Sequence, residues 1–469
     1  MAELAGQKGI KLSAYLETLP AGALVRLVHE LDRVTIVDDL DASNSLILES
    51  ARQALRSSGR FGKLAAQPER AAFADAEPFR IHVVTDRKHR GRISAEALRK
   101  IWQVLARGEG GDEIAAAACE HAVQLTCFDR PSRTPLQDQR DVVYKALLDL
   151  RKLAASMPGE LGRNRSRINA PHALEELADL TAIVSMGGRL ETFRAASRFA
   201  ISEATLADDA LRARLVQALA PFSDEELVYP VVMTLGRLPN PGSLVHLLTA
   251  TEGSDDPGKL MRSRYACVAN ALLNELDILV ELVAARLGEW KVTDGVIPAV
   301  RRFHEISTSL TVAIDLDGQS DWATRLAAKR RRIADTLRDT LERTLAVLRL
   351  GIQPNVPGLG MPDAIDTEHA IASAELLMAI RPLRSELALN ECVTRVHAAV
   401  ENFFDTAARA LPQQARQASP ADRAVLDVRF DALYRTSVPL FGEEYAALLR
   451  RSCEVAGLRL PEREDSCAA

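Results

Sequence analysis

The sequence predicts an all-α, multi-helical fold with little or no β-structure, and three observations lead to that prediction. Aromatic residues make up only 4% of the 469-residue chain, so the core must be built mainly from Leu, Ala, Val and Ile. Leu and Ala have high helix propensity, whereas strands favour β-branched and aromatic residues. Apolar residues recur at steps of three and four along most of the chain, which is the period of an α-helix. Prolines and glycines gather in a few polar stretches that separate the helical segments.

The clearest predicted helix covers residues 93–107. Ser94 is placed to cap its N-terminus, and Leu98, Ile101, Trp102 and Leu105 fall on one face. The same reasoning predicts further helices at 13–32, 43–57, 112–126, 138–156, 172–186, 188–219, 223–238, 260–288, 297–313, 321–350, 366–411 and 421–456. Pro382 interrupts the segment 366–411, so two helices or one kinked helix are expected there.

Two stretches rich in turn residues, 158–171 and 351–365, are predicted to be linkers between two or three helical subdomains. The expected parts are an N-terminal helical domain (1–157) with a long loop at 59–78, a central helical domain (172–350) and a C-terminal helical subdomain (366–460). Three Arg-Leu echoes in the middle of the chain, at Arg189, Arg237 and Arg286, recur at 48 and 49 residues. This spacing is compatible with helical-pair packing of the HEAT type, and it also arises by chance in a chain rich in Arg and Leu.

Charge and composition bear on compartment and partner. The formal net charge of −5 creates no overall field that attracts nucleic acid or an anionic membrane. The N-terminus lacks the apolar core of a signal peptide, and no apolar run reaches the roughly 18 residues of a membrane span. Six scattered cysteines form no disulfide framework. These features predict a cytoplasmic protein, and the excess of Arg and Ala is typical of a GC-rich bacterial genome.

Residues 34–59 imitate the start of a receiver domain. Asp38 and Asp39 end a β-branched segment, and Asp86 follows 47 residues after Asp39. A receiver needs further strands alternating with helices, and residues 87–157 read as helices only. We therefore interpret the two aspartates as part of a turn that caps the helix at 43–57.

No cofactor or metal site is predicted. The stretch that begins at Asp315 lacks the spacing of an EF-hand, because Gly318 takes the fourth position and Leu326 the twelfth. On a helix, Cys119 and His121 would point roughly 200° apart, so they could not share one metal. His304 opens an "HExxH" pattern whose last position is Thr308. Phosphate-binding glycine loops and a "GxSxG" elbow are absent from the sequence.

The candidate catalytic residues are His397, Glu401 and Arg395. His397 and Glu401 share a helix face at a spacing of four residues, which would allow half of a carboxylate–histidine site. The alternative, which the sequence favours, is an ordinary salt-linked helix face.

Two local groups of cations are candidate contacts for an anion or a partner: Lys329, Arg330, Arg331 and Arg332, and Arg87, Lys88, Arg90 and Arg92. The first group lies within the long leucine-bearing helix predicted at 321–350, but its members point around the helix and no aromatics are interleaved for base stacking. Acids follow at Asp335, Asp339 and Glu342. The pattern favours a bundle helix whose charges cancel.

Together these observations predict a bacterial helical interaction or scaffold protein without a cofactor. It would act through a protein partner or self-association and not through nucleic acid. Two alternatives remain open at this point. One is an enzyme with a polar pocket between helical subdomains, and the other is a nucleic-acid or anionic-ligand binder that uses the two cation groups.

Overall fold

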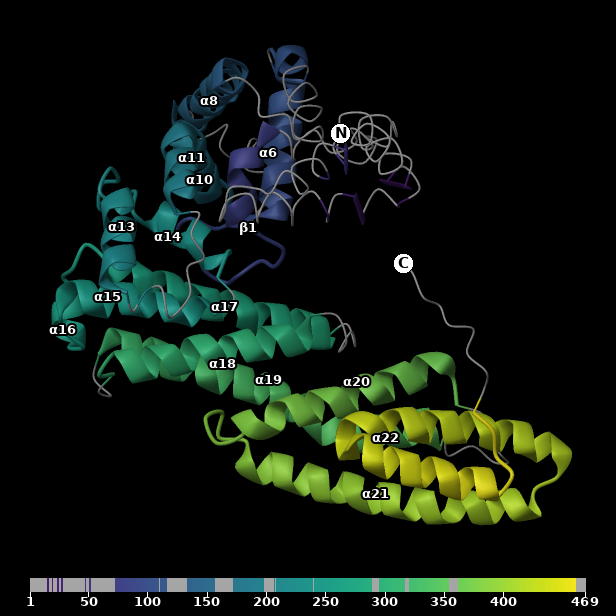
Figure 1. The fold of residues 1–469 in the computed structure, drawn as a ribbon. Helices are drawn as coiled ribbons and strands as arrows, with labels where there is room; N and C mark the ends of the chain where they lie inside the picture. Colours follow the sequence, from purple (N-terminus) through teal and green to yellow (C-terminus); the bar gives the residue numbers. More distant parts are fainter. Residues whose placement is uncertain are drawn as a thin grey trace, which may run out of the picture. The chain divides into compact units, whose positions relative to one another are not determined.

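A computed structural model of the chain confirms the all-α prediction. Helices account for 80% of the described residues, and the sheet within them is one pair of two-residue strands (Figure 1). The structure describes residues 72–108, 110–115, 133–156, 172–197, 208–238, 240–288, 295–316, 320–353 and 362–460, together with a few single residues elsewhere. Within these residues, no helix combines the length and the apolar character that crossing a bilayer requires.

The chain divides into two compact units, Met1–Asn274 and Glu275–Ala469, and the division falls within helix α17. The first predicted linker, 158–171, and residues 354–361 of the second, 351–365, lie outside the described residues. The predicted division into three parts therefore stays a prediction.

Unit 1 (Met1–Asn274) is organised around helix α10 (Ala173–Ser185), which packs against η1, β2, α6, α8 and α11. The two strands pair in parallel, with Arg80 opposite Ile93 and Ile81 opposite Ser94. The other elements of this unit are η1 (Ala74–Phe79), β1 (Arg80–Ile81), β2 (Ile93–Ser94), α6 (Ala95–Arg107), α8 (Arg133–Ser156), α11 (Gly187–Ala196), α13 (Asp209–Leu219), α14 (Val228–Leu235), η2 (Pro241–Leu244), α15 (Val245–Glu252), α16 (Pro257–Leu260) and the start of α17 (Ala266–Gly288).

Local capping explains where the predicted helix boundaries hold and where they are wrong. The hydroxyl of Ser94 accepts a hydrogen bond from Ala97 N at 3.1 Å, as expected for the start of α6. The single helix predicted at 188–219 is wrong, because α11 ends at Ala196 and Asp208 caps a new helix by accepting from two backbone N–H groups. The short helix α15 was not predicted, since it lies between Pro241 and Gly253 in a stretch dense in turn residues.

Unit 2 (Glu275–Ala469) consists of long helices (Figure 1). After the end of α17 come α18 (Val296–Ala313), α19 (Asp321–Ile352), α20 (Ala364–Ile380), η3 (Arg381–Leu383), α21 (Asn390–Gln417) and α22 (Pro420–Val455). Helix α19 packs along α20, and both α20 and α21 pack against α22. The segment 366–411 is split at Pro382 as predicted. Helix α22 is itself two helices joined by a kink at Gly442. The φ of Gly442 is 84°, a positive value that glycine adopts readily.

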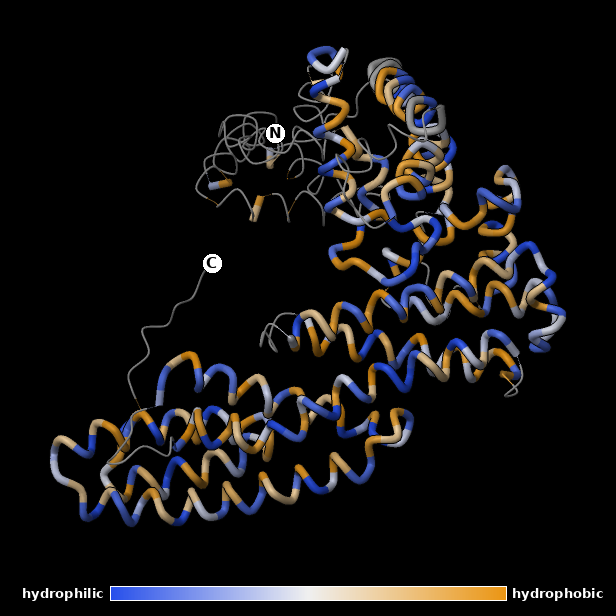
Figure 2. The backbone as a smooth tube through the Cα atoms, turned by 180° about the vertical axis from the view of Figure 1, so that it is seen from behind, coloured by the Kyte–Doolittle hydropathy of each residue, from blue (hydrophilic) through white to orange (hydrophobic). Residues whose placement is uncertain are grey.

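Hydrophobic and hydrophilic residues are interspersed along the long helices of unit 2 (Figure 2). On α19, Leu326, Ile333, Leu337, Leu341 and Leu348 of the predicted apolar stripe are buried, and Leu345 is half-buried. The helix continues two residues beyond its predicted end. Gly351 permits a close approach of α19 to α20, because a Cβ there would lie 2.4 Å from the Asp366 carbonyl oxygen.

Candidate functional site

The cation group at 329–332 is bound largely by carboxylates of its own unit. Lys329 is buried and its ammonium bonds Asp277, while Arg332 Nη2 lies 2.6 Å from Glu281 Oε1. Both acids belong to the part of α17 that lies in unit 2. Helix α19 is thereby tied to α17 by two ion pairs, and a third pair, Arg302 with Glu275, ties α18 to α17 at 3.2 Å.

The remaining two cations of this group point elsewhere. Arg330 bonds residues of α18, and Arg331 is exposed and forms no ion pair with any described residue. Successive helical residues are rotated by roughly 100°, so four adjacent cations cannot share one face. Of the acids that follow, Glu342 pairs with Arg395 of α21, and Asp335 pairs with Arg338.

The cation group at 87–92 belongs to a loop that binds a buried carboxylate, Asp179 of α10, through Lys88 and Gly91. Lys88 Nζ lies 2.5 Å from Asp179 Oδ2, which also accepts from Gly91 N at 2.9 Å. The Tyr229 hydroxyl donates to Asp179 Oδ1 at 2.9 Å. Arg92 is buried, Arg87 is exposed, and Arg90 lies 3.8 Å from Glu225. In this group, Lys88 is therefore bound within the protein.

Glu176, one turn before Asp179 on α10, is a second buried carboxylate that holds the same loop. Its two oxygens accept from Ser94 N at 2.7 Å and from the Ser94 hydroxyl at 3.3 Å. Burial raises the pKa of Glu176 above its ordinary value, although these bonds and the nearby Lys88 and His172 act in the opposite direction. Burial also raises the pKa of Tyr229, and the charge of Asp179 adds to that shift.

Sequence reasoning missed Glu176 and Asp179. The available signal was a pair of acids, three residues apart, on the apolar face of the predicted helix 172–186. Buried acids are usually hydrogen-bonded, and a charged one also needs a partner cation, so this pair calls for donors from another segment. The sequence does not show which segment supplies them.

The three candidate catalytic residues do not converge among the described residues. His397 Nδ1 lies 3.3 Å from Glu401 Oε1, as their spacing predicted, and Arg395 Nη2 lies 2.7 Å from Glu342 of α19. Arg395 and His397 are two residues apart and hence roughly 200° apart around α21. His397 Nε2 is buried without a hydrogen-bond partner among the described residues. Their catalytic role stays a prediction.

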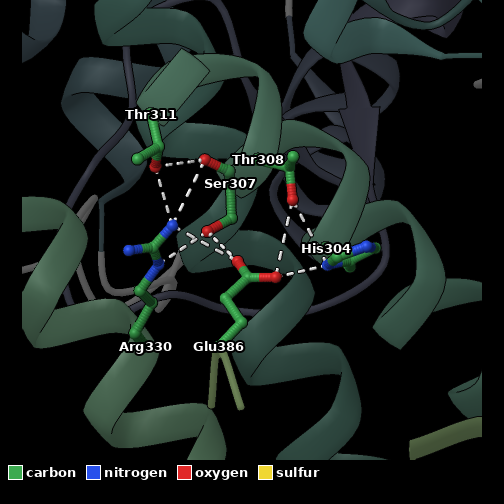
Figure 3. Close-up of polar contacts among 6 residues, drawn as sticks. All are labelled: His304, Ser307, Thr308, Thr311, Arg330 and Glu386. Carbon is green, nitrogen blue, oxygen red and sulfur yellow. Dashed lines mark hydrogen bonds and ion pairs between the residues drawn. The ribbon is translucent and has the colours of Figure 1, made fainter. Parts of the chain in front are cut away.

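The structure instead gathers polar side chains around Glu386, in the connector between η3 and α21 (Figure 3). The Ser307 hydroxyl donates to Glu386 Oε1 at 2.5 Å, and Arg330 Nη2 lies 3.3 Å from the same oxygen. His304 Nδ1 bonds Glu386 Oε2, and Thr308 Oγ1 lies 3.5 Å from that oxygen. We call this group, with Thr311, the Glu386 cluster. It joins α18, α19 and the connector.

A histidine bonded to a carboxylate beside a serine invites comparison with a catalytic triad, but the connectivity differs. In a triad the carboxylate orients the imidazole and the serine bonds the other ring nitrogen. Here Ser307 donates to the carboxylate itself, and its oxygen accepts from Arg330 Nε at 2.7 Å. Ser307 is also fully buried. The serine is therefore engaged in structural hydrogen bonds and is not placed as a nucleophile.

The connector that carries Glu386 has a strained backbone position. Ala388 has a φ of 52°, in the left-handed region that favours glycine. The turn is closed by Leu389 N, which donates to the Arg384 carbonyl at 2.8 Å. The Glu386 cluster anchors this turn to α18 and α19, and such anchoring is what allows a strained residue to persist.

Metal binding finds no support among the described residues, where no three His, Cys, Asp or Glu side chains are grouped to hold an ion. His304, which opens the incomplete "HExxH" pattern, is a member of the Glu386 cluster. The segments 34–59 and 119–127, which contain Asp38, Asp39, Cys119, His121 and Cys127, lie for the most part outside the described residues.

Comparisons of the chain with protein-family models, with curated proteins and with solved structures found no match. The fold and the contacts above therefore stand alone as the basis for a functional proposal.

Proposed function

We propose that this chain is a helical interaction protein that binds a partner protein through the solvent face of the last part of α22, residues 443–455. The observation that carries this proposal is a pair of exposed apolar side chains. Leu448 is 64% exposed and Val455 is 83% exposed. They are seven residues apart, so they lie on one helix face.

The opposite face of the same helix explains why these side chains are left in solvent. Ala446, Leu449 and Cys453 are buried and anchor this part of α22 to its unit. Leu448 and Val455 point away from that buried face. Fully burying such a side chain contributes about 1.5–3 kcal/mol, so covering both would make a substantial contribution to association. Apolar side chains spaced seven residues apart form the surface through which one helix packs against another.

The ionic contacts support an interaction role over the two alternatives. Lys88, Lys329, Arg332 and Arg395 are paired with carboxylates within their own units, so these four cations are not free to bind a phosphate backbone. Of the catalytic candidates, His397 and Glu401 lie together, whereas Arg395 bonds Glu342 instead. We propose a protein partner or a second copy of the chain, and no cofactor.

A cytoplasmic location is part of the proposal. Cys267, Cys392 and Cys453 are free thiols. Burial raises the pKa of Cys267 to about 12 and that of Cys453 to about 11, which keeps both as unreactive thiols. Unpaired buried cysteines are typical of proteins from a reducing compartment.

The test is a double variant in which both exposed apolar residues are replaced, Leu448→Glu and Val455→Glu. The matched control is Val312→Glu, because Val312 is 78% exposed on α18. Light scattering after size exclusion measures self-association, and crosslinking in cell extract followed by mass spectrometry detects a partner. We expect the double variant to lose the assembly while its unfolding midpoint stays that of the wild type. Unchanged assembly in the double variant would refute this face as the binding surface.

A further inference from the structure

Unit 1 contains an open pocket of about 370 Å³ that none of the contacts above fills. It lies where η1, β1 and the first turns of α6 meet. The parallel pairing of β1 with β2 sets this geometry, since β2 runs directly into α6 and places Arg80 beside the start of that helix. Pockets that hold small organic molecules have volumes of roughly 300–1,000 Å³, so this one is large enough.

The pocket has an apolar floor and a charged rim. Phe73 and Leu98 are almost fully buried and form the floor. The charged and polar side chains at its rim are Glu77, Arg80, His82, Glu96 and Arg99. This combination is typical of sites that bury an apolar body and orient it through one polar group.

Both acids at the rim are already bound. Glu77 pairs with Arg80 at 3.3 Å. Glu96 Oε1 lies 2.5 Å from Lys100 Nζ, and that ion pair lowers the pKa of Glu96, so the carboxylate stays charged. Because Lys100 neutralises Glu96, this acid offers little attraction to a cationic ligand.

The two arginines at the rim, Arg80 and Arg99, have N–H donors that no described residue uses. Arg80 bonds Glu77 through Nη1 alone, at 3.3 and 3.4 Å, which leaves its Nη2 without a hydrogen bond to any described residue. Arg99 is exposed and forms no ion pair with any described residue. A guanidinium carries five N–H donors, and its planar fork matches carboxylate and phosphate oxygens.

From this arrangement we propose that the pocket binds a small organic anion, with a carboxylate or phosphate group at Arg99 and Arg80 and an apolar body over Phe73 and Leu98. The site lies in unit 1 and does not depend on the partner-binding face of α22. Its ligand would be a metabolite-sized molecule, in keeping with a pocket volume of about 370 Å³.

The test uses benzoate and phenyl phosphate as probes, with benzyl alcohol as the uncharged counterpart, titrated into the full chain by calorimetry. We expect saturable binding of at least one anion and at least about tenfold weaker binding of benzyl alcohol, since a charge-assisted hydrogen bond is lost. Binding of benzoate alone would assign the site to carboxylates, and binding of phenyl phosphate alone would assign it to phosphate esters.

Variants locate the binding. Arg99→Gln changes an exposed helix residue and should weaken anion binding about five- to tenfold without unfolding the chain. Arg107→Gln is the matched control, because Arg107 is exposed on the same helix and does not line the pocket. Equal loss in both variants, equal affinity for benzyl alcohol, or no saturable binding of either anion would overturn the proposal.

Discussion

The buried carboxylates of unit 1 and the Glu386 cluster of unit 2 use acids in different ways. Glu176 and Asp179 are 4% and 6% exposed, and they project from a helix to hold a loop through backbone N–H groups and Lys88. Glu386 projects from a connector, its side chain is 17% exposed, and its donors are side chains on two helices. The first arrangement fastens a loop to a rigid helix, and the second fastens a strained connector to a pair of helices.

The difference teaches that burial, more than the number of bonds, sets how much such a contact contributes. A buried charge that loses its partner cannot recover its bonds from water, whereas a half-buried one does so in part. The predictions below are ordered by the size of the effect that this comparison implies.

The largest effect is expected for Asp179→Asn. The substitution leaves the ammonium of Lys88 in a buried site without a charged partner, and removing one member of a buried pair costs about 3–5 kcal/mol. Denaturant unfolding followed by circular dichroism measures it. A loss below about 1 kcal/mol would mean that the Lys88–Asp179 pair does not hold the loop.

Glu176→Gln is the matched control on the same helix, and it should change stability by less than about 1 kcal/mol. The amide oxygen of Gln can still accept from Ser94 N, and the neutral side chain avoids the burial penalty that raises the pKa of Glu176. Since the folded pKa lies above the unfolded value, the wild type should lose stability as pH rises from about 4.5 through the folded pKa. Glu176→Gln should remove that part of the pH dependence, and a slope of the same size in both proteins would contradict the assignment.

Glu386→Gln should have a smaller effect, of about 1–2 kcal/mol. It removes the charge that Arg330 and Ser307 bond, in a site that water partly reaches. Glu375→Gln, at an exposed position of α20, is the control with no expected change. Equal unfolding free energies for the two variants would show that the Glu386 cluster does not stabilise the connector.

Arg332→Glu should destabilise by about 1 kcal/mol, because it places a second negative charge beside Glu281 at a partly exposed site. Arg331→Glu makes the same charge change at the preceding residue and is the control. It should have almost no effect, since Arg331 is exposed and forms no ion pair with any described residue. Titration of duplex and single-stranded DNA and RNA at two salt concentrations provides the second measurement. Micromolar binding at physiological salt that either variant abolishes would restore the nucleic-acid alternative.

The smallest effect concerns Glu226, whose pKa Arg189 lowers to about 2. A lowered pKa contributes stability above pH 4.5, and that contribution is lost as pH falls towards 2. Both side chains are partly exposed, so screening should hold the contribution below about 1 kcal/mol. Arg189→Gln should flatten the stability curve between these pH values, opposite in sign to the slope that Glu176 contributes. If Arg189→Gln loses as much stability as the wild type between pH 4.5 and 2, the Arg189–Glu226 pair is not the source of that loss.

The sequence by itself determined the helical class and most of the helices, because periodicity and capping are local properties. Ser94 and Ser320 begin helices through hydrogen bonds within three residues, and Pro382 ends one by its own geometry. Residues 188–219 show the limit of this reasoning, since two amphipathic helices in succession resemble one until the cap at Asp208 is recognised. The sequence also predicted that the charges on the helix at 321–350 would be neutralised. It did not predict that residues on other helices would provide the partner charges.

Only the tertiary structure decided which charges meet. Asp277 and Glu281 bond cations about 50 residues away, Asp179 bonds a lysine 91 residues earlier in the chain, and Glu386 gathers residues from two other elements. Such pairings depend on how helices pack, which a single sequence does not encode at the level of individual side chains. The pocket beside Arg80 and Arg99 arises in the same way, because a two-residue strand pairing places them at one opening. Hydrogen bonds and ion pairs are short-ranged, so residues distant in sequence form them only after packing has fixed their positions.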